Sequence, residues 1–175
     1  MTSPMKNPMK KLIAGTALAM TLIPALASAQ KMVILTRHAE RADGAAAMAT
    51  AAGTPADPPL SAAGEARAQK LLAMLADANI TAMFTTELRR TKDTAAPLAA
   101  KLKLAPEVIA ASQAAVVAEA IKAKAADTVF VVGHSNTVPA IIKALGGPDV
   151  TIGDNEYDNL FIWVPATKTL TRIRY

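Results

Sequence analysis

The chain has 175 residues, of which 52% are hydrophobic, 19% are charged and 3% are aromatic, and its formal net charge is +5. This composition excludes a disordered or collagen-like chain and fits a single globular domain, while the scarcity of aromatic side chains argues against nucleic-acid binding by base stacking. The chain has no cysteine, which excludes disulfides, thiolate metal sites, an acylated lipoprotein and a cysteine nucleophile.

The first 29 residues have the pattern of a secretory signal peptide. Three lysines precede an uncharged run over residues 12–27, and small residues stand at Ala27 and Ala29. This pattern predicts cleavage before Gln30. Cleavage would leave 146 residues and lower the formal charge from +5 to +2, because the removed part holds three lysines and no acid. The alternative is an uncleaved anchor, but the apolar run is shorter than the roughly 20 residues that span a bilayer. We expect an exported protein, periplasmic or secreted, without a stable membrane anchor.

Apolar runs typical of buried strands alternate with alanine-rich helical stretches along residues 30–175. The predicted strands are 32–36, 80–85, 128–133 and 160–165, and the predicted helices are 62–78, 91–102, 113–126 and 139–145. Segments 42–59 and 147–158 break the alternation and are predicted to be loops. The alternation predicts an α/β fold, a three-layer α/β/α sandwich with a mostly parallel sheet and helices on both faces.

Polar clusters follow three of the predicted strands, at residues 36–41, 85–90 and 133–137. The only two histidines of the chain, His38 and His134, lie in the first and the last cluster. Because ligands of open α/β sheets bind beyond the carboxyl ends of the strands, we expect these clusters to meet. Neighbouring arginines repel one another unless an anion lies between them, and a guanidinium fork matches phosphate oxygens. A histidine nitrogen in such a pocket can attack phosphorus when its other nitrogen is held by a hydrogen bond.

Four segments of the chain form a set when they are taken together. They are Leu35-Thr36-Arg37-His38-Ala39-Glu40, Asp57-Pro58-Pro59-Leu60-Ser61-Ala62-Ala63-Gly64, Thr85-Thr86-Glu87-Leu88-Arg89-Arg90-Thr91-Lys92-Asp93-Thr94-Ala95 and Val131-Val132-Gly133-His134-Ser135. In motif content and order they resemble the histidine phosphatase superfamily, the phosphoglycerate mutase-like proteins. The resemblance spans nearly all of residues 30–175, which we interpret as the catalytic domain. One departure is Ala39, which stands where the family usually has glycine.

The resemblance implies roles for five residues. By it, His38 is the nucleophile that becomes a phosphohistidine, and Arg37, Arg90 and His134 bind the phosphate. Arg41 stands where the acid-phosphatase and phytase branch often has a further phosphate-binding arginine. The implied activity is that of a phosphoric monoester hydrolase acting on a phosphorylated small molecule or phosphoprotein, and no cofactor is implied. No metal is expected, because a pocket of arginines repels a divalent ion.

The sequence does not identify the proton donor for the leaving group. Residues 110–114 read Ala-Ala-Ser-Gln-Ala where the mutase-like branch has an acid, and Ser135 stands where the phytase-like branch has aspartate. The candidates are Glu156, Asp158, Glu40 and Glu107, of which Glu156 is preferred because its loop precedes the last strands. Alternatively the leaving group needs little protonation, as in a phosphohistidine, an anhydride or an aryl phosphate. An alkyl phosphate would lose general-acid help worth on the order of a hundred-fold or more.

Each assignment has a plainer alternative. Taken singly, His38 and His134 fit ordinary buried histidines at strand ends. Arg89 is interpreted as a solvated or helix-capping arginine, and Glu40 and Glu87 as carboxylates that hold arginines, since a carboxylate beside a guanidinium stays ionised. The rival function is a noncatalytic phosphate-ligand binding module. A phosphomutase is a weaker alternative, because a mutase must exclude water and this chain has few residues for a lid.

Overall fold

A computed structural model describes residues 32–42, 57–124 and 128–175 of the chain. The elements are β1 (Met32–Arg37), α1 (Ala62–Leu75), β2 (Ala82–Thr85), α2 (Arg89–Leu102), β3 (Glu107–Val108), α3 (Ala114–Ala123), β4 (Thr128–Gly133), α4 (Thr137–Ala144), β5 (Asn159–Val164) and β6 (Thr169–Arg174). Within these ranges no helix has the length and apolar character that a membrane span requires. The predicted signal peptide, most of the loop predicted over 42–59 and the predicted helix end at 125–126 lie outside the described residues.

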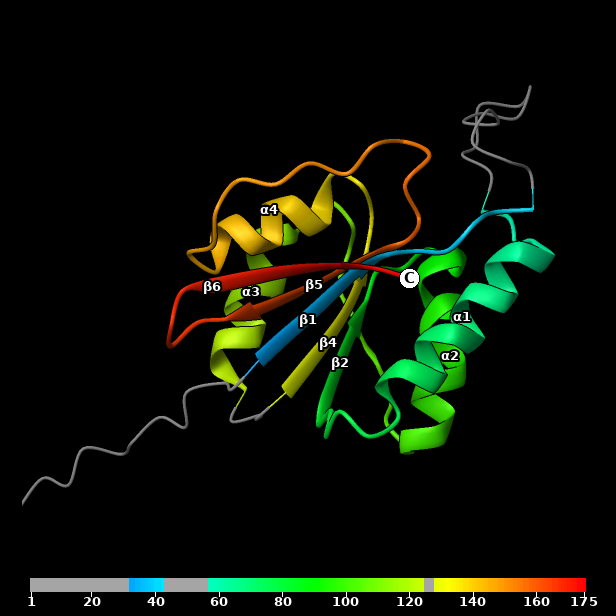
Figure 1. Ribbon diagram of the computed structural model, residues 1–175, viewed down its shortest axis with the longest axis horizontal. Coiled ribbons are helices and arrows are strands. Elements are labelled where there is room, and N and C mark those ends of the chain that lie inside the picture. Colours follow the sequence, from blue (N-terminus) through cyan, green and yellow to red (C-terminus); the bar gives the residue numbers. More distant parts are fainter. Residues whose placement is uncertain (1–31, 43–56, 125–127) are drawn as a thin grey trace, which may run out of the picture.

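The six strands form one sheet in the order β3-β2-β4-β1-β5-β6. The strands β1 to β4 pair in parallel, whereas β5 is antiparallel to β1 and β6 is antiparallel to β5. Figure 1 shows α1 and α2 on one face of the sheet and α3 and α4 on the other. The predicted three-layer sandwich with a mostly parallel sheet is confirmed.

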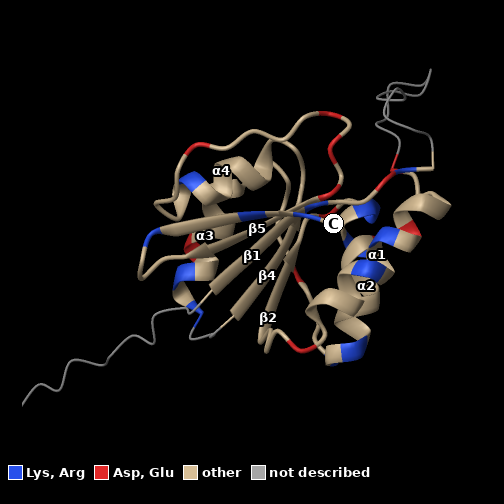
Figure 2. Ribbon diagram, viewed as in Figure 1, with Lys and Arg blue, Asp and Glu red and all other residues tan. Residues whose placement is uncertain are grey.

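The sheet separates two hydrophobic cores. Side chains alternate along a strand, so Val33 and Leu35 of β1 pack toward α3 and α4, while Ile34 packs toward α1 and α2. Both faces of β1 and β4 are therefore covered, which explains why these strands appear in the sequence as continuous apolar runs. Figure 2 shows the charged residues on helices, loops and β6, with few on the central strands.

The two strands that the sequence did not predict both lie at edges of the sheet. β3 has only two residues and both are exposed, and β6 is mostly exposed along its length. Neither carries a run of buried apolar side chains, which is the pattern by which strands are recognised. Their position beside β2 and β5, rather than their composition, makes them strands.

Helix α1 is placed by a close backbone approach at Gly64. Ser61 caps the helix, because its hydroxyl accepts a 3.2 Å hydrogen bond from the Gly64 amide, and the Ser61 amide donates to the Glu40 carbonyl at 2.9 Å. A Cβ atom on Gly64 would overlap that same Glu40 carbonyl oxygen. Glycine at this position therefore lets α1 pack directly against the turn that follows β1.

Candidate active site

The register of the two central strands brings the histidines together. β1 and β4 are parallel neighbours, and Arg37, the last residue of β1, pairs with Gly133, the last residue of β4. The next residue on each chain is a histidine, and the His38 and His134 ring centroids lie 5.2 Å apart in an edge-to-face arrangement. A shift of the pairing by a few residues would separate the two rings.

A pocket of about 460 Å³ opens at this end of the sheet. Its lining residues are Arg37, His38, Arg41, Leu88, Arg90, Ala111, His134, Ser135, Asn136, Asp154 and Tyr157. Five of the six site residues predicted from the sequence therefore share one hollow. The sixth, Glu156, does not line it.

The hydrogen bonds of His38 determine which ring nitrogen can react. The His38 side chain lies 4% exposed at the end of β1, and its Nδ1 is 2.8 Å from the carbonyl oxygen of Ala39. A carbonyl oxygen only accepts hydrogen bonds, so Nδ1 carries the proton and Nε2 keeps its lone pair. Burial lowers the pKa of His38 to about 3, and the charges of Arg90 and Arg37 act in the same direction. The ring is therefore neutral near pH 7 and can act as a nucleophile at Nε2.

His134 is held from two sides by threonine hydroxyls. The His134 amide donates to Thr137 Oγ1 at 2.7 Å, and the ring Nε2 lies 3.0 Å from Thr86 Oγ1. Thr86 Oγ1 is in turn 3.0 Å from Thr91 Oγ1, so the contact extends into a buried network. Burial, followed by the charge of Arg90, lowers the pKa of His134 to about 4. With Nε2 engaged, Nδ1 is the nitrogen left for a ligand.

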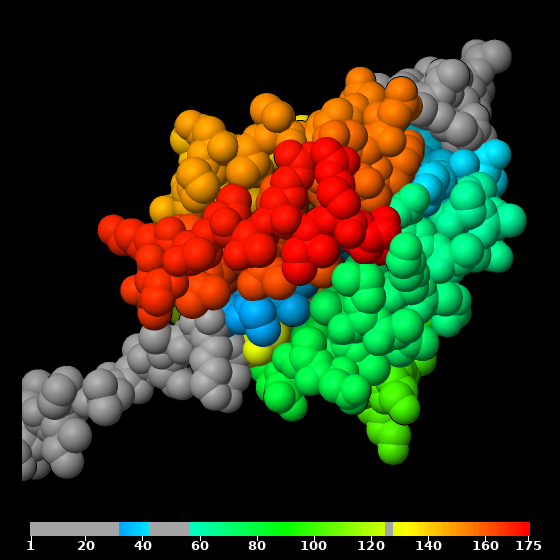
Figure 3. All heavy atoms as spheres, viewed as in Figure 1, coloured from blue at the N-terminus to red at the C-terminus, as the bar shows by residue number. Residues whose placement is uncertain are grey.

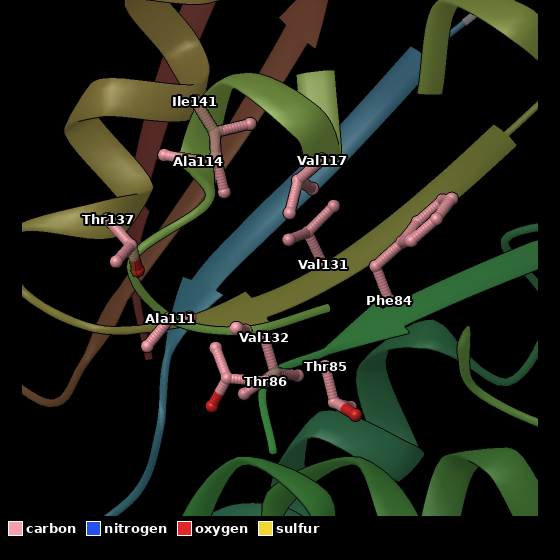
Figure 4. A pocket seen from close by; sticks show the side chains of 12 residues that line it. Phe84, Thr85, Thr86, Ala111, Ala114, Val117, Val131, Val132, Thr137 and Ile141 are labelled. Atoms are coloured by element: carbon pink, nitrogen blue, oxygen red, sulfur yellow. The ribbon is translucent and has the colours of Figure 1, made fainter. Parts of the chain in front are cut away.

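A small apolar pocket of about 10 Å³ lies behind His134, between β2 and β4 on one side and α3 and α4 on the other. Figure 4 shows Thr86 and Thr137 in its lining together with apolar side chains such as Val131 and Ile141. The space is at most that of one water molecule. The two threonines that hold His134 thus lie in a largely apolar region, where the low local dielectric strengthens their hydrogen bonds.

Arg37 is oriented by backbone carbonyls of the loop between α4 and β5. Its Nη1 donates to the carbonyl oxygens of Gly153 at 2.9 Å, Asp154 at 2.7 Å and Glu156 at 3.4 Å. The guanidinium carbon lies 4.1 Å from the centroid of the Tyr157 ring. Within the described parts of the chain, Arg37 Nε is buried without a hydrogen-bond partner. These neutral contacts orient the guanidinium without cancelling its charge, so the group stays available to an anion.

The structure separates the two neighbouring arginines at the start of α2. Arg90 lines the pocket, its side chain is 15% exposed, and its Nη1 lies 3.8 Å from Asp57 Oδ1. Arg89 has a side chain that is 58% exposed and pairs with Asp93, as expected for a solvated arginine. Asp57 also accepts from the Arg89 amide with both carboxylate oxygens at 2.9 Å. It therefore serves the N-terminus of α2, whose own N-cap residue makes no side-chain capping bond.

The carboxylate of Glu156, the proton donor preferred from the sequence, is bound to groups outside the pocket. Its oxygens accept from Arg174 at 2.6 Å, from the Gly153 amide at 2.9 Å and from Arg172 at 3.1 Å. These hydrogen bonds, that of Arg174 first, hold the pKa of Glu156 at about 2. An ionised carboxylate tied to two arginines outside the pocket has no proton to give. The geometry therefore does not support Glu156 as the donor.

The remaining donor candidates are also ion-paired outside the pocket. Glu40 bonds to Arg67, Asp158 to Arg174 and Glu107 to Lys124. Burial raises the pKa of Glu40, but the hydrogen bonds and charge of Arg67 outweigh it and the net shift is downward. Of the carboxylates that the structure describes, only that of Asp154 belongs to a residue lining the pocket.

Glu40 holds an arginine, as predicted from the sequence. Its carboxylate accepts three hydrogen bonds from Arg67, between 2.7 and 3.0 Å long. Glu87 was expected to do the same, but its carboxylate accepts a 2.8 Å hydrogen bond from the Ala111 amide instead. Its contact is with the backbone that precedes α3, because that segment passes beside the end of β2.

Sequence reasoning missed three residues of the site. Thr86 stood in one of the motifs without a role, and Asp154 and Tyr157 lie in the segment 147–158, which was predicted to be a polar loop without a part in the site. Tyr157 is one of only two tyrosines in the chain and packs 6.0 Å from the His38 ring centroid. The one signal in the sequence that could have identified Tyr157 is the position of an aromatic residue inside an acidic loop.

Comparisons with known proteins concern the family and the fold of this chain. Residues 33–111 match the sequence pattern of the histidine phosphatase superfamily (branch 1). No curated protein matches the sequence significantly.

Among solved structures, a protein of Agrobacterium tumefaciens proposed to be the phosphohistidine phosphatase SixA has 19% identity and a TM-score of 0.56, and the match covers 82% of this chain and 96% of that protein. A mycobacterial glucosyl-3-phosphoglycerate phosphatase has 17% identity and a TM-score of 0.58, covering 83% and 98%. The protein histidine phosphatase SixA with tungstate has 15% identity and a TM-score of 0.57, covering 81% and 94%.

Proposed function

We propose that this chain, whose residues 33–111 match the histidine phosphatase superfamily (branch 1), hydrolyses phosphate monoesters or related phosphoryl groups through a covalent phosphohistidine on His38. The observation that carries the proposal is the state of the His38 ring. Its Nδ1 is committed to the Ala39 carbonyl, its Nε2 keeps a lone pair, and the ring lines a pocket with two arginines and a second histidine.

In the first step, the phosphoryl group of the substrate binds between Arg37, Arg90 and His134. The lone pair of His38 Nε2 forms a bond to phosphorus while the bond from phosphorus to the leaving group breaks. The leaving group departs with that electron pair and takes up a proton. Arg37 and Arg90 stabilise the negative equatorial oxygens, and Arg41 adds positive charge at the rim of the pocket.

In the second step, water attacks the phosphorus atom of the phosphohistidine. The bond between phosphorus and Nε2 breaks, the electron pair returns to the ring, and inorganic phosphate leaves. The ring is returned to its starting tautomer because Nδ1 keeps its proton on the Ala39 carbonyl throughout. No cofactor or metal takes part in either step.

The pocket favours substrates whose leaving group needs little protonation. The described lining offers one carboxylate, that of Asp154, and the side chain of Glu156 lies outside it. A phosphohistidine, an anhydride or an aryl phosphate meets this condition better than an alkyl phosphate. The fold is shared with the protein histidine phosphatase SixA, so phosphohistidine in a protein or small molecule is the substrate class we propose to test first. Export, proposed from residues 1–29, would place the reaction outside the cytoplasm.

The test compares the wild-type protein with His38→Ala in the release of phosphate from an activated aryl phosphate and from an alkyl phosphate. We expect the variant to lose at least about a thousand-fold in kcat/KM, since the nucleophile is gone. We expect the wild type to favour the aryl phosphate by on the order of a hundred-fold or more. Rapid quenching should trap an acid-labile phosphohistidine only in the wild type.

A different pattern would point to the noncatalytic binding module. If both proteins release phosphate at the same negligible rate while inorganic phosphate still binds to the wild type, the pocket holds an anion without turning it over. A labelled phosphoryl group that returns to a second position of the organic substrate, rather than appearing as inorganic phosphate, would instead indicate a phosphomutase.

A further inference from the structure

The carbonyl oxygens that hold Arg37 come from one tight turn of the loop before β5. The Glu156 amide donates to the Gly153 carbonyl at 3.0 Å and so closes the turn. The same Gly153 carbonyl accepts from Arg37 Nη1 at 2.9 Å, and the Asp154 and Glu156 carbonyls accept from the same nitrogen. The position of Arg37 therefore depends on the shape of a four-residue turn.

The carboxylate of Glu156 closes this turn a second time and ties it to the edge of the sheet. One of its oxygens accepts from the Gly153 amide at 2.9 Å and from Arg172 at 3.1 Å, and the other accepts from Arg174 at 2.6 Å. Both arginines belong to β6, which is paired with β5 along six residues. Figure 3 shows β6 and the loop before β5 in contact on the molecular surface.

We propose that Glu156 is a positioning residue, whose carboxylate fixes the turn at 153–156 on β6 so that the backbone carbonyls of the turn aim Arg37 into the pocket. The inference rests on the proposed function, because it assigns Glu156 to the orientation of the phosphate-binding guanidinium. It replaces the role of proton donor that the sequence suggested for the same residue. This contact between Glu156 and β6 is needed because the neutral carbonyls orient Arg37 only while the turn that carries them keeps its conformation.

Ion-pair energy alone does not account for the arrangement. The Glu156 and Arg174 side chains are 33% and 49% exposed, and exposed pairs of this kind contribute little to stability. Asp158 provides the comparison, since it also accepts from Arg174 at 2.6 Å and its side chain is 36% exposed. Among the described residues, its carboxylate makes no hydrogen bond or ion pair with the turn that holds Arg37. Both acids bind Arg174 and Glu156 also binds Arg172, but of the two only Glu156 accepts a hydrogen bond from the turn.

The experiment compares Glu156→Ala with Asp158→Ala in the full chain. We expect Glu156→Ala to raise the KM for an aryl phosphate and the dissociation constant of inorganic phosphate by roughly tenfold, and Asp158→Ala to change either by less than about twofold. In the Arg37→Ala background, Glu156→Ala should cause no further loss, because the group that it positions is absent. The nitrogen-15 signals of the Arg37 side chain, recorded without ligand, should be sharp in the wild type and in Asp158→Ala and broadened in Glu156→Ala.

These measurements separate the failure of the inference from the failure of the proposed function. Equal effects of the two alanine variants, an undiminished effect of Glu156→Ala in the Arg37→Ala background, or an unchanged Arg37 signal would each overturn the positioning role. A wild type without phosphatase activity whose Arg37 signal still broadens only in Glu156→Ala would refute the phosphatase and retain the positioning role. Circular dichroism on each variant checks the fold, and we expect it to be kept in Glu156→Ala and Asp158→Ala, whose side chains are about one third exposed.

Discussion

Two walls of the same pocket are built in different ways. One wall consists of the ends of β1, β4 and β2, where His38 and His134 are 4% and 7% exposed and are held by carbonyl and hydroxyl oxygens. The other wall is the loop at 153–157, whose backbone carbonyls hold Arg37 and whose turn is stabilised by a carboxylate and two arginines that are one third to one half exposed. The two histidines of the first wall are buried and uncharged, whereas the side chains that hold the second wall are partly exposed and charged.

The difference follows the chemistry that we propose for each wall. A nucleophile needs a fixed tautomer and an uncharged ring, and burial provides both at the strand ends. A phosphate-binding guanidinium must keep its charge and be oriented, and neutral carbonyls on a loop provide that. The two walls should therefore respond differently to acid, to removal of single hydroxyl groups and to salt.

Lowering the pH should give the largest effect, a loss of stability that comes from the two histidines of the strand-end wall. Burial holds the pKa of His38 at about 3 and that of His134 at about 4, below the ordinary value near 6.5. Below pH 6.5 the unfolded chain therefore binds more protons than the folded chain, and stability falls as the pH falls. We expect each ring to cost roughly 2 kcal/mol of unfolding free energy between pH 7 and pH 5. Urea unfolding at a series of pH values measures the slope.

The loop wall at 153–157 should respond differently to the same change in pH. The pKa of Glu156 is lowered from 4.5 to about 2, so its contribution to stability is complete above the usual glutamate range and is lost as the pH falls from about 4.5 through about 2. The turn at 153–156 should stay formed at pH 5. The variants His38→Gln and His134→Gln should each flatten the stability profile between pH 7 and pH 5. A profile that is already flat in the wild type would contradict the burial of two neutral rings.

Removal of one hydroxyl tests the strand-end wall more locally. Thr86→Val keeps the shape of the side chain but deletes the oxygen that lies 3.0 Å from His134 Nε2. We expect kcat/KM to fall by roughly tenfold and the unfolding free energy to fall by about 1–2 kcal/mol, because a buried partner is lost. Steady-state kinetics and urea unfolding measure the two quantities.

Thr85→Val is the matched control for this variant. Thr85 is adjacent in sequence and also buried, but within the described chain its hydroxyl has no hydrogen-bond partner. Its replacement should leave kcat/KM unchanged and should leave stability unchanged or raise it, since a buried unsatisfied oxygen is removed. Similar losses in both variants would show that the hydroxyl contact with His134 does not matter.

Salt should give the smallest effect, and it should act on the loop wall alone. The Gly153 amide donates to a carboxylate at the surface, whereas the His134 amide donates to the buried Thr137 hydroxyl. About 1 M sodium chloride shortens the Debye length to about 3 Å, so exchange of the Gly153 amide should rise roughly two- to threefold. Exchange of the His134 amide should not change. Equal responses of the two amides in hydrogen-exchange measurements would argue against the distinction between the walls.

The sequence by itself determined the layered fold and the strand-end position of the histidines, and the resemblance to the family selected Arg90 over Arg89. The first two features follow from local rules, because buried parallel strands appear as apolar runs and their ends meet at one edge of the sheet. It did not reveal β3 or β6, since edge strands without a buried face lack such a run. The predicted signal peptide depends on residues outside the described ones and stays a prediction.

Only the tertiary structure decided what the loop before β5 does. Backbone carbonyls have no signature in the sequence, so the hydrogen bonds that hold Arg37 could not be predicted from it. Glu156 was assigned to proton transfer because it is acidic and precedes the last strands. The folded chain instead pairs Glu156 with Arg172 and Arg174, residues that lie next to it only because β6 returns antiparallel to β5. Strand order and register bring these charges together, and distant pairing of that kind depends on the whole sheet rather than on any local segment.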